Sequence, residues 1–169
     1  MKLSGKVTIV TGGGSGIGRA TALLFAEEGA RVVVADWNRE TGMETVADIC
    51  TEGREATFCH TDVSKAREVE KMVGTAVERY GKLNVLFNNA AIQVLKRLVD
   101  TEEEEWERVH SVNSKGVFLG CKYAIPAMIQ SGGGSIINMA SVLGFVGDPD
   151  LAAYCAAKGG VIALTKAAA

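Results

Sequence analysis

The sequence has 169 residues, a length that suits one domain and buries a hydrophobic core without disulfides or a structural metal. It is 47% hydrophobic and 22% charged, which excludes a disordered, collagenous or coiled-coil chain. The net charge of −2, with no basic stripe, provides no surface for nucleic acid.

Targeting and metal signals are absent from the sequence. The longest uninterrupted apolar run, Leu151–Ala157, is too short to cross a membrane, and no signal-peptide core follows Met1. The four cysteines and two histidines show no CxxC or Cys/His ligand spacing, so we expect reduced thiols and no metal site. These observations predict a cytoplasmic protein without a membrane partner.

Short apolar runs alternate with segments of helical periodicity along the whole chain. Nearly continuous apolar character, typical of parallel strands buried on both faces, predicts strands at 6–11, 31–36, 55–59, 83–88 and 135–140. Helices are expected at 17–28, 39–52, 64–80, 102–130 and from Leu151 onward, with Thr101 and Glu104 as a capping box for the fourth. Five strand–helix units in series predict an α/β fold with a doubly wound parallel sheet.

A glycine-rich loop joins the first predicted strand to the first helix. It reads Thr11-Gly12-Gly13-Gly14-Ser15-Gly16-Ile17-Gly18. Such glycines let a diphosphate approach the backbone N–H groups at a helix N-terminus, although this loop does not satisfy G-x-G-x-x-G. Gly13 and Gly18 have the spacing of a nucleoside-triphosphate loop, but Arg19 and Ala20 stand where that motif needs Lys and Ser or Thr. Phosphoryl transfer is therefore disfavoured, and a turn that only packs the helix remains the alternative.

Asp36 ends the second predicted strand, 18 residues beyond Gly18. A carboxylate there can accept hydrogen bonds from the ribose hydroxyls of an adenine dinucleotide, and it would repel the 2′-phosphate of NADP. Trp37, rather than a phosphate-binding Arg or Lys, follows it, so NAD is favoured over NADP. Arg39 lies close enough in sequence to reach a phosphate, which keeps the second cofactor open.

Every predicted strand has a polar or glycine residue at or just beyond its carboxyl end. They are Gly12, Asp36, Asp62, Asn88-Asn89 and Ser141. The carboxyl ends of parallel strands share one edge of a sheet, which is where open α/β sheets bind ligands. The alternative at each position is local: a turn, a helix cap or a loop hydroxyl.

Tyr154 and Lys158 lie four residues apart on the last predicted helix and therefore on one face. A phenol has a reference pKa of ~10, and lowering it to ~7 takes about 4 kcal/mol. A unit charge ~4 Å away supplies that at an effective dielectric of about 20. The pair therefore predicts an acid/base tyrosine, with a half-buried tyrosine beside a snorkelling lysine as the alternative.

Together these residues resemble the short-chain dehydrogenase/reductase family from Lys6 to Ala169. The carrying motifs, in the family's order, are the glycine loop, Asp62-Val63, Asn88-Asn89-Ala90, Asn113, Ser141 and Tyr154-x-x-x-Lys158. The resemblance implies a Rossmann-type dinucleotide-binding domain over residues 1–169. One departure is Ala91, which stands where the family usually has glycine.

The resemblance also implies a role for each matching residue. Tyr154 is implied as the catalytic acid/base, Ser141 as the hydroxyl that orients the substrate oxygen, and Asn113 as the holder of a proton-relay water. Lys158 is implied to bind a cofactor ribose and to lower the tyrosine pKa, and Asp62 to contact the adenine. The implied cofactor-binding residues are Gly12, Gly14, Ser15, Gly16, Ile17, Gly18, Asp36, Asp62, Val63, Asn89, Ala90, Tyr154 and Lys158.

The predicted function is hydride transfer between NAD and a small alcohol or carbonyl substrate, with Tyr154 carrying the proton. The stretches 93–95 and 142–151 are expected to line the substrate pocket; they carry few charges, which favours a small, largely apolar alcohol. The alternatives are an NADPH-dependent 3-oxoacyl reductase, which Asp36 opposes, and a non-catalytic dinucleotide-binding sensor or scaffold. A homo-oligomer is expected.

A complete doubly wound domain normally adds a sixth strand after this last helix, so we expect the domain to be C-terminally incomplete. The sheet edge beside the fifth strand would then lack its cover, as would three apolar residues of the last helix, Val161, Ile162 and Leu164. Exposed edges and apolar patches predict self-association, weak NAD binding and little activity for residues 1–169 alone.

Overall fold

The computed structural model describes residues 1–169 and contains one five-stranded sheet, in which every strand pairing is parallel. The strand order is β3-β2-β1-β4-β5, so β1 lies at the centre and the chain winds outward in both directions. The strands are β1 (Val7–Thr11), β2 (Arg31–Asp36), β3 (Ala56–His60), β4 (Val85–Asn88) and β5 (Ser135–Asn138). The predicted doubly wound α/β fold is confirmed.

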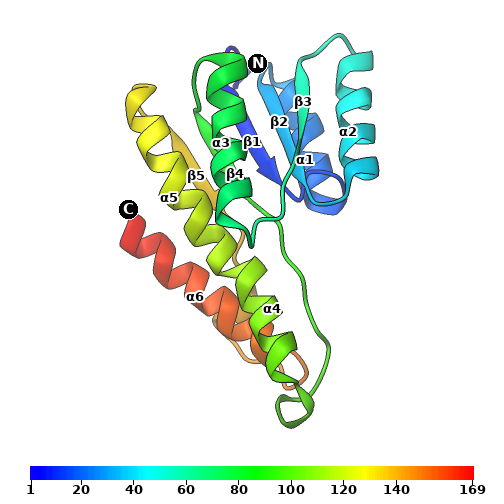
Figure 1. The fold of residues 1–169 in the computed structure, drawn as a ribbon, viewed down its shortest axis with the longest axis vertical. Coiled ribbons are helices and arrows are strands. Elements are labelled where there is room, and N and C mark those ends of the chain that lie inside the picture. The colour runs from blue at the N-terminus through cyan, green and yellow to red at the C-terminus, as the bar shows by residue number, and fades with distance from the viewer.

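Helices flank the sheet on both faces (Figure 1). They are α1 (Gly16–Glu27), α2 (Arg39–Thr51), α3 (Ala66–Tyr80), α4 (Glu103–Asn113), α5 (Lys115–Gln130) and α6 (Ala152–Ala168). Two short 3-10 turns, η1 (Leu98–Asp100) and η2 (Val142–Gly144), lie in the connections that precede α4 and α6. No helix combines the length and the apolarity needed to cross a lipid bilayer.

The core has two layers, one on each face of the sheet. Alternate residues of β1 point to opposite faces, so Ile9 packs with α3 and α5 while Val10 packs with α1 and α2. Both side chains are fully buried, as they must be in a parallel sheet covered on both sides. Burying apolar surface stabilises the packing of the helices on each face by about 25 cal/mol per Å². This packing holds the carboxyl ends of the strands side by side.

Strand β5 departs from the prediction of burial on both faces. It pairs only with β4, and Ile137 is 45% exposed, whereas Ile136 packs against the core beside α5. The prediction that Val161 lacks cover is wrong, because this side chain of α6 is fully buried against Val117 and Cys121 of α5. The face of β5 that lacks cover is the one that points away from α6.

The predicted helix 102–130 is two helices, and its predicted capping box is displaced by one residue. Glu102 caps α4 and Glu105 closes the box with a bond from the Glu102 N–H, while the Thr101 hydroxyl donates to the Arg97 carbonyl instead. The two helices are separated at Ser114, whose φ of −109° is more negative than the usual helical value although its backbone stays in the helical region. In Figure 1 α4 and α5 accordingly form one long bent rod.

Candidate active site

The glycine loop between β1 and α1 has the backbone shape that its glycines predict. Gly12 and Gly16 have φ of +66° and +50°, which L side chains rarely adopt. A Cβ on Gly18 would overlap the Gly12 carbonyl oxygen, so this glycine is required for the loop to close on the helix. The α1 cap residue, Ser15, makes no side-chain capping bond and is exposed. The N-terminal turn of α1 is thus open to an anionic ligand.

Asp36 lies at the carboxyl end of β2 and is only 6% exposed. Its two carboxylate oxygens accept backbone N–H bonds from Gly14 at 2.8 Å and from Asn38 at 2.9 Å. These bonds hold the carboxylate beside the glycine loop. A Cβ on Gly14 would lie 3.0 Å from the nearer oxygen and 2.5 Å from the Thr41 hydroxyl, which explains the glycine there.

Thr11 connects the ends of β1 and β4, a role that the sequence did not indicate. Its hydroxyl accepts the N–H groups of Asn89 and Ala90, at 2.9 and 3.1 Å, and donates to the Phe87 carbonyl at 3.3 Å. The Asn89 amide donates to the Thr11 carbonyl at 2.9 Å. Asn89 and Ala90 are therefore fixed next to Gly12.

Asp62 follows β3 and adopts the turn role that was its local alternative. One of its oxygens accepts from both the N–H and the hydroxyl of Ser64, at 2.9 and 2.7 Å. Its own N–H donates to the Glu68 carboxylate at 2.8 Å. Val63, 8% exposed, packs into the core that includes α3. The turn thus presents Asp62 at the sheet edge.

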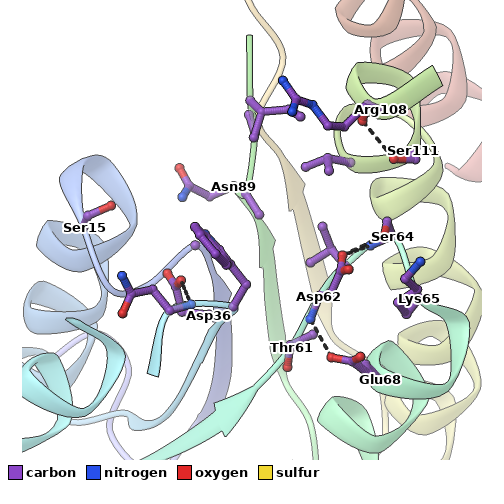
Figure 2. A pocket seen from close by; sticks show the side chains of 18 of the residues that line it. Ser15, Asp36, Thr61, Asp62, Ser64, Lys65, Glu68, Asn89, Arg108 and Ser111 are labelled. Carbon is purple, nitrogen blue, oxygen red and sulfur yellow. Dashed lines mark hydrogen bonds between the residues drawn. The ribbon is translucent and has the colours of Figure 1, made fainter. Parts of the chain in front are cut away.

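These positions line one pocket of about 1170 Å³ at the carboxyl edge of the sheet. Figure 2 shows Ser15 and Asp36 on one side, Asn89 at the centre, and Asp62 with Ser64 on the other side. Arg108 and Ser111 of α4 complete the wall, although no sequence pattern singled them out. The predicted cofactor-binding residues in the lining are Gly12, Ser15, Gly16, Ile17, Asp36, Asp62, Val63, Asn89 and Ala90.

Tyr154, Lys158, Ser141 and Asn113 do not line this pocket. Lys158 is 1% exposed, and its ammonium donates to the carbonyl of Met139, just beyond β5, at 2.6 Å. Burial lowers the pKa of Lys158 to about 8. The ammonium lies 5.6 Å from the centroid of the Tyr154 ring. Lys158 and Tyr154 are therefore neighbours on one face of α6, and the Met139 carbonyl, which has no sequence signal, anchors the lysine at the same sheet edge.

Ser141 and Asn113 are both committed to local structure. The Ser141 hydroxyl accepts the Leu143 N–H at 3.2 Å and caps η2. Asn113, fully buried at the end of α4, clamps the backbone of Ile92: it accepts its N–H and donates to its carbonyl, both at 2.8 Å. The Asn113 side chain is thus a structural clamp between α4 and the segment after β4.

Comparisons with known proteins agree with this geometry. The family model described as short chain dehydrogenase matches residues 6–169. An uncharacterized oxidoreductase of Thermotoga maritima is 47% identical over 96% of the chain, and the cyclohexanol dehydrogenase of Acinetobacter sp. is 42% identical over 99%. The solved structure of an NAD+-bound xylitol dehydrogenase superposes with a TM-score of 0.96 at 39% identity over 100% of the chain.

The chain spans 64% of the Thermotoga maritima protein, 67% of the cyclohexanol dehydrogenase and 65% of the xylitol dehydrogenase chain. Within that part, the fold of this chain and that of the xylitol dehydrogenase are alike across all five strands. With the family model covering nearly the entire chain, these matches show that the protein belongs to the short-chain dehydrogenase/reductase family.

Proposed function

We propose that this protein is an NAD-dependent oxidoreductase that moves a hydride between the cofactor and a small alcohol or its carbonyl product. One observation carries the proposal: the fixed Asp36 carboxylate and the buried Lys158 ammonium beside Tyr154 lie at the same carboxyl edge of the sheet. That edge is where doubly wound sheets bind dinucleotides. Residues 1–169 then lie within one dinucleotide-binding domain.

The residues of the pocket fit NAD in chemistry and in space. Positive φ at Gly12 and Gly16 leaves the open helix N-terminus accessible to a diphosphate, and a Cβ on Gly12 would come within 3.0 Å of the Asn89 amide. Asp36 would accept the adenosine ribose hydroxyls, and Asp62 with Val63 would border the adenine. Ile17 and Ala90 would border the diphosphate and nicotinamide. Gly14 and Gly18 do not line the pocket; they are buried and would keep the glycine loop in its shape.

When bound, NAD supplies the hydride acceptor, and the chain supplies binding, orientation and a proton route. We assign the substrate hydroxyl proton to Tyr154, which takes it up on alcohol oxidation and returns it on carbonyl reduction. The Lys158 ammonium lies beside the Tyr154 ring, 5.6 Å from its centroid. Ser141 would donate to the substrate oxygen, and Asn113, at the end of α4, would position a water that relays the proton to solvent.

Small alcohols are the substrates we propose. Lys96 directly follows the segment 93–95, and its N–H donates to the Asp150 carbonyl of the segment 142–151 at 2.8 Å. This bond joins the two segments. Exposed apolar side chains on these segments, Leu95, Val142 and Phe145, favour an apolar substrate wall. The cyclohexanol dehydrogenase among the relatives supports the same class.

We propose further that the working form is a homo-oligomer. Helix α5 carries Phe118, Ile125 and Ile129 at helical spacing, exposed by 47%, 36% and 71%. Contiguous exposed apolar surface favours association between proteins. Sedimentation velocity reports the size directly; a monomer at all concentrations contradicts this part of the proposal.

The test is cofactor binding followed by turnover. Calorimetry measures the binding of NAD, and absorbance of NADH follows oxidation of cyclohexanol, cyclopentanol and 2,3-butanediol. With the natural full-length polypeptide we expect NAD binding together with NADH formation from at least one of them. Binding without turnover on any alcohol or ketone would favour a sensor or scaffold, and absence of NAD binding would contradict the whole proposal.

A further inference from the structure

Residues 92–96 run between the two helices that carry the proposed catalytic side chains. At one end, Asn113 of α4 clamps the Ile92 backbone by two hydrogen bonds. In the middle, Val94 packs against a buried cluster made of Val109 of α4 with Ala153 and Ala157 of α6. Ala153 and Ala157 directly precede Tyr154 and Lys158 in the chain. The position of this segment is therefore coupled to that of α6.

Lys96 closes the other end of the segment. Its backbone bridges to Leu151, the residue directly before α6, and its N–H donates to the Asp150 carbonyl. Its ammonium lies 2.7 and 2.8 Å from the two carboxylate oxygens of Glu105, in the first turn of α4. Glu105 also accepts the Glu102 N–H and so completes the cap of α4. Lys96 thus connects the start of α4 to the start of α6.

We infer that Lys96 is a positioning residue: through Glu105 and Leu151 it fixes the first turn of α6, and with it Tyr154, against α4. The inference rests on the proposed role of Tyr154. Its consequence is kinetic, because a partly exposed ion pair contributes little to the free energy of unfolding. A displacement of about 1 Å at a reacting group, in contrast, costs about 10²-fold in rate.

The chain offers a matched control at the next residue. Arg97 forms an ion pair with Asp100 at 2.7 Å, but both partners are in the same short turn and join no helices. Arg97→Met therefore removes a comparable exposed charge from the same segment. Lys96→Arg retains the positive charge and serves as the conservative rescue, and Glu105→Gln removes the partner charge while retaining an acceptor for the Glu102 N–H.

Two readouts separate positioning from a structural role. The first is amide hydrogen exchange, which does not need turnover: we expect Lys96→Met and Glu105→Gln to speed exchange in residues 152–158 by about tenfold, with α3 unchanged. The second is kcat for NADH formation, expected to fall about 10- to 100-fold while the KM for NAD stays within about twofold. Lys96→Arg should restore most of both, and Arg97→Met should change neither.

Equal exchange in Lys96→Met and Arg97→Met would overturn the inference, and so would an unchanged kcat. If the wild-type chain itself forms no NADH, the proposed function fails, but the exchange measurement still decides whether Lys96 holds α6. General unfolding of Lys96→Met would speed exchange in α3 as well. In that case Glu105→Gln shows whether loss of the ion pair alone loosens α6.

Discussion

Asp36 lines the pocket, and each of its carboxylate oxygens accepts a hydrogen bond from a backbone N–H group. A fixed, largely buried carboxylate cannot swing away from a ligand, so a phosphate placed beside it meets uncompensated repulsion. The position of this residue could be predicted from the sequence, because it ends a strand at the usual distance from a glycine loop. Its two backbone partners could not, since they depend on how the loop folds back.

Replacement of Asp36 should change cofactor choice. We expect wild-type protein to bind NAD at least about tenfold more tightly than NADP, a difference of ~1.4 kcal/mol. Asp36→Asn keeps a carbonyl acceptor and removes the charge, so NADP binding should improve while NAD binding weakens; adding Trp37→Arg should reverse the preference. Titrations with both cofactors measure this. A wild-type preference for NADP would contradict the assignment and implicate Arg39.

Lys158 makes the stability of the protein depend on pH in the alkaline range. Burial lowers its pKa from 10.5 to about 8, so below pH 8 the lysine is charged in both states and the folded state bears the cost of the buried charge. Between about pH 8 and 10.5 the folded protein releases the proton before the unfolded chain does. The contribution of Lys158 to the free energy of unfolding therefore becomes less unfavourable as pH rises through this window.

The comparison with Lys158→Met isolates this effect. Between pH 7.5 and 10 the free energy of unfolding of the wild type should rise by about 2 kcal/mol relative to that of the variant. Urea denaturation of both proteins at several pH values in this range measures it. Parallel pH profiles for the two proteins would show that the lysine is not titrating near pH 8.

At the scale of elements, strand and helix bounds follow from apolar periodicity to within one or two residues in most of the chain. The exception is the break between α4 and α5. Asn113, just before the break, is held by the Ile92 backbone, 21 residues earlier. Gly116, just after the break, leaves room for Val63, because a Cβ on Gly116 would lie 2.9 Å from the valine side chain. Both contacts are tertiary, so periodicity within 102–130 could not reveal them.

Helix α5 also depends on Gly120, although glycine has a low intrinsic helix propensity. A Cβ on Gly120 would overlap the amide of Asn88, which ends β4 and donates to Asn138 of β5 at 2.9 Å. Gly120→Ala should therefore destabilise the protein by about 1–3 kcal/mol. Gly74→Ala, in the interior of α3, where a Cβ would only come within 3.9 Å of the Glu78 carboxylate, should stabilise by about 0.5–1 kcal/mol. Urea midpoints of the two variants test the contrast, and a loss of stability of equal size in both would contradict it.

At the scale of the whole molecule, the parallel sheet brings side chains from five separate strand ends to one edge. Sequence could predict that convergence because the carboxyl ends of parallel strands meet there whatever the loops do. It could not predict that the lining includes Arg108 and Ser111, or that Met139 anchors Lys158. A helix face turned toward a pocket and a backbone carbonyl have no residue-type signature.

The central claim is that this edge performs hydride transfer with Tyr154 as the proton carrier, and one variant tests it most directly. Tyr154→Phe removes a single oxygen and keeps the ring beside Lys158. NAD affinity and kcat for alcohol oxidation are measured on the variant and the wild type. The account predicts NAD binding within about threefold of wild type and a fall in kcat of roughly 10² to 10⁴. Near-normal turnover in the Tyr154→Phe protein would contradict it.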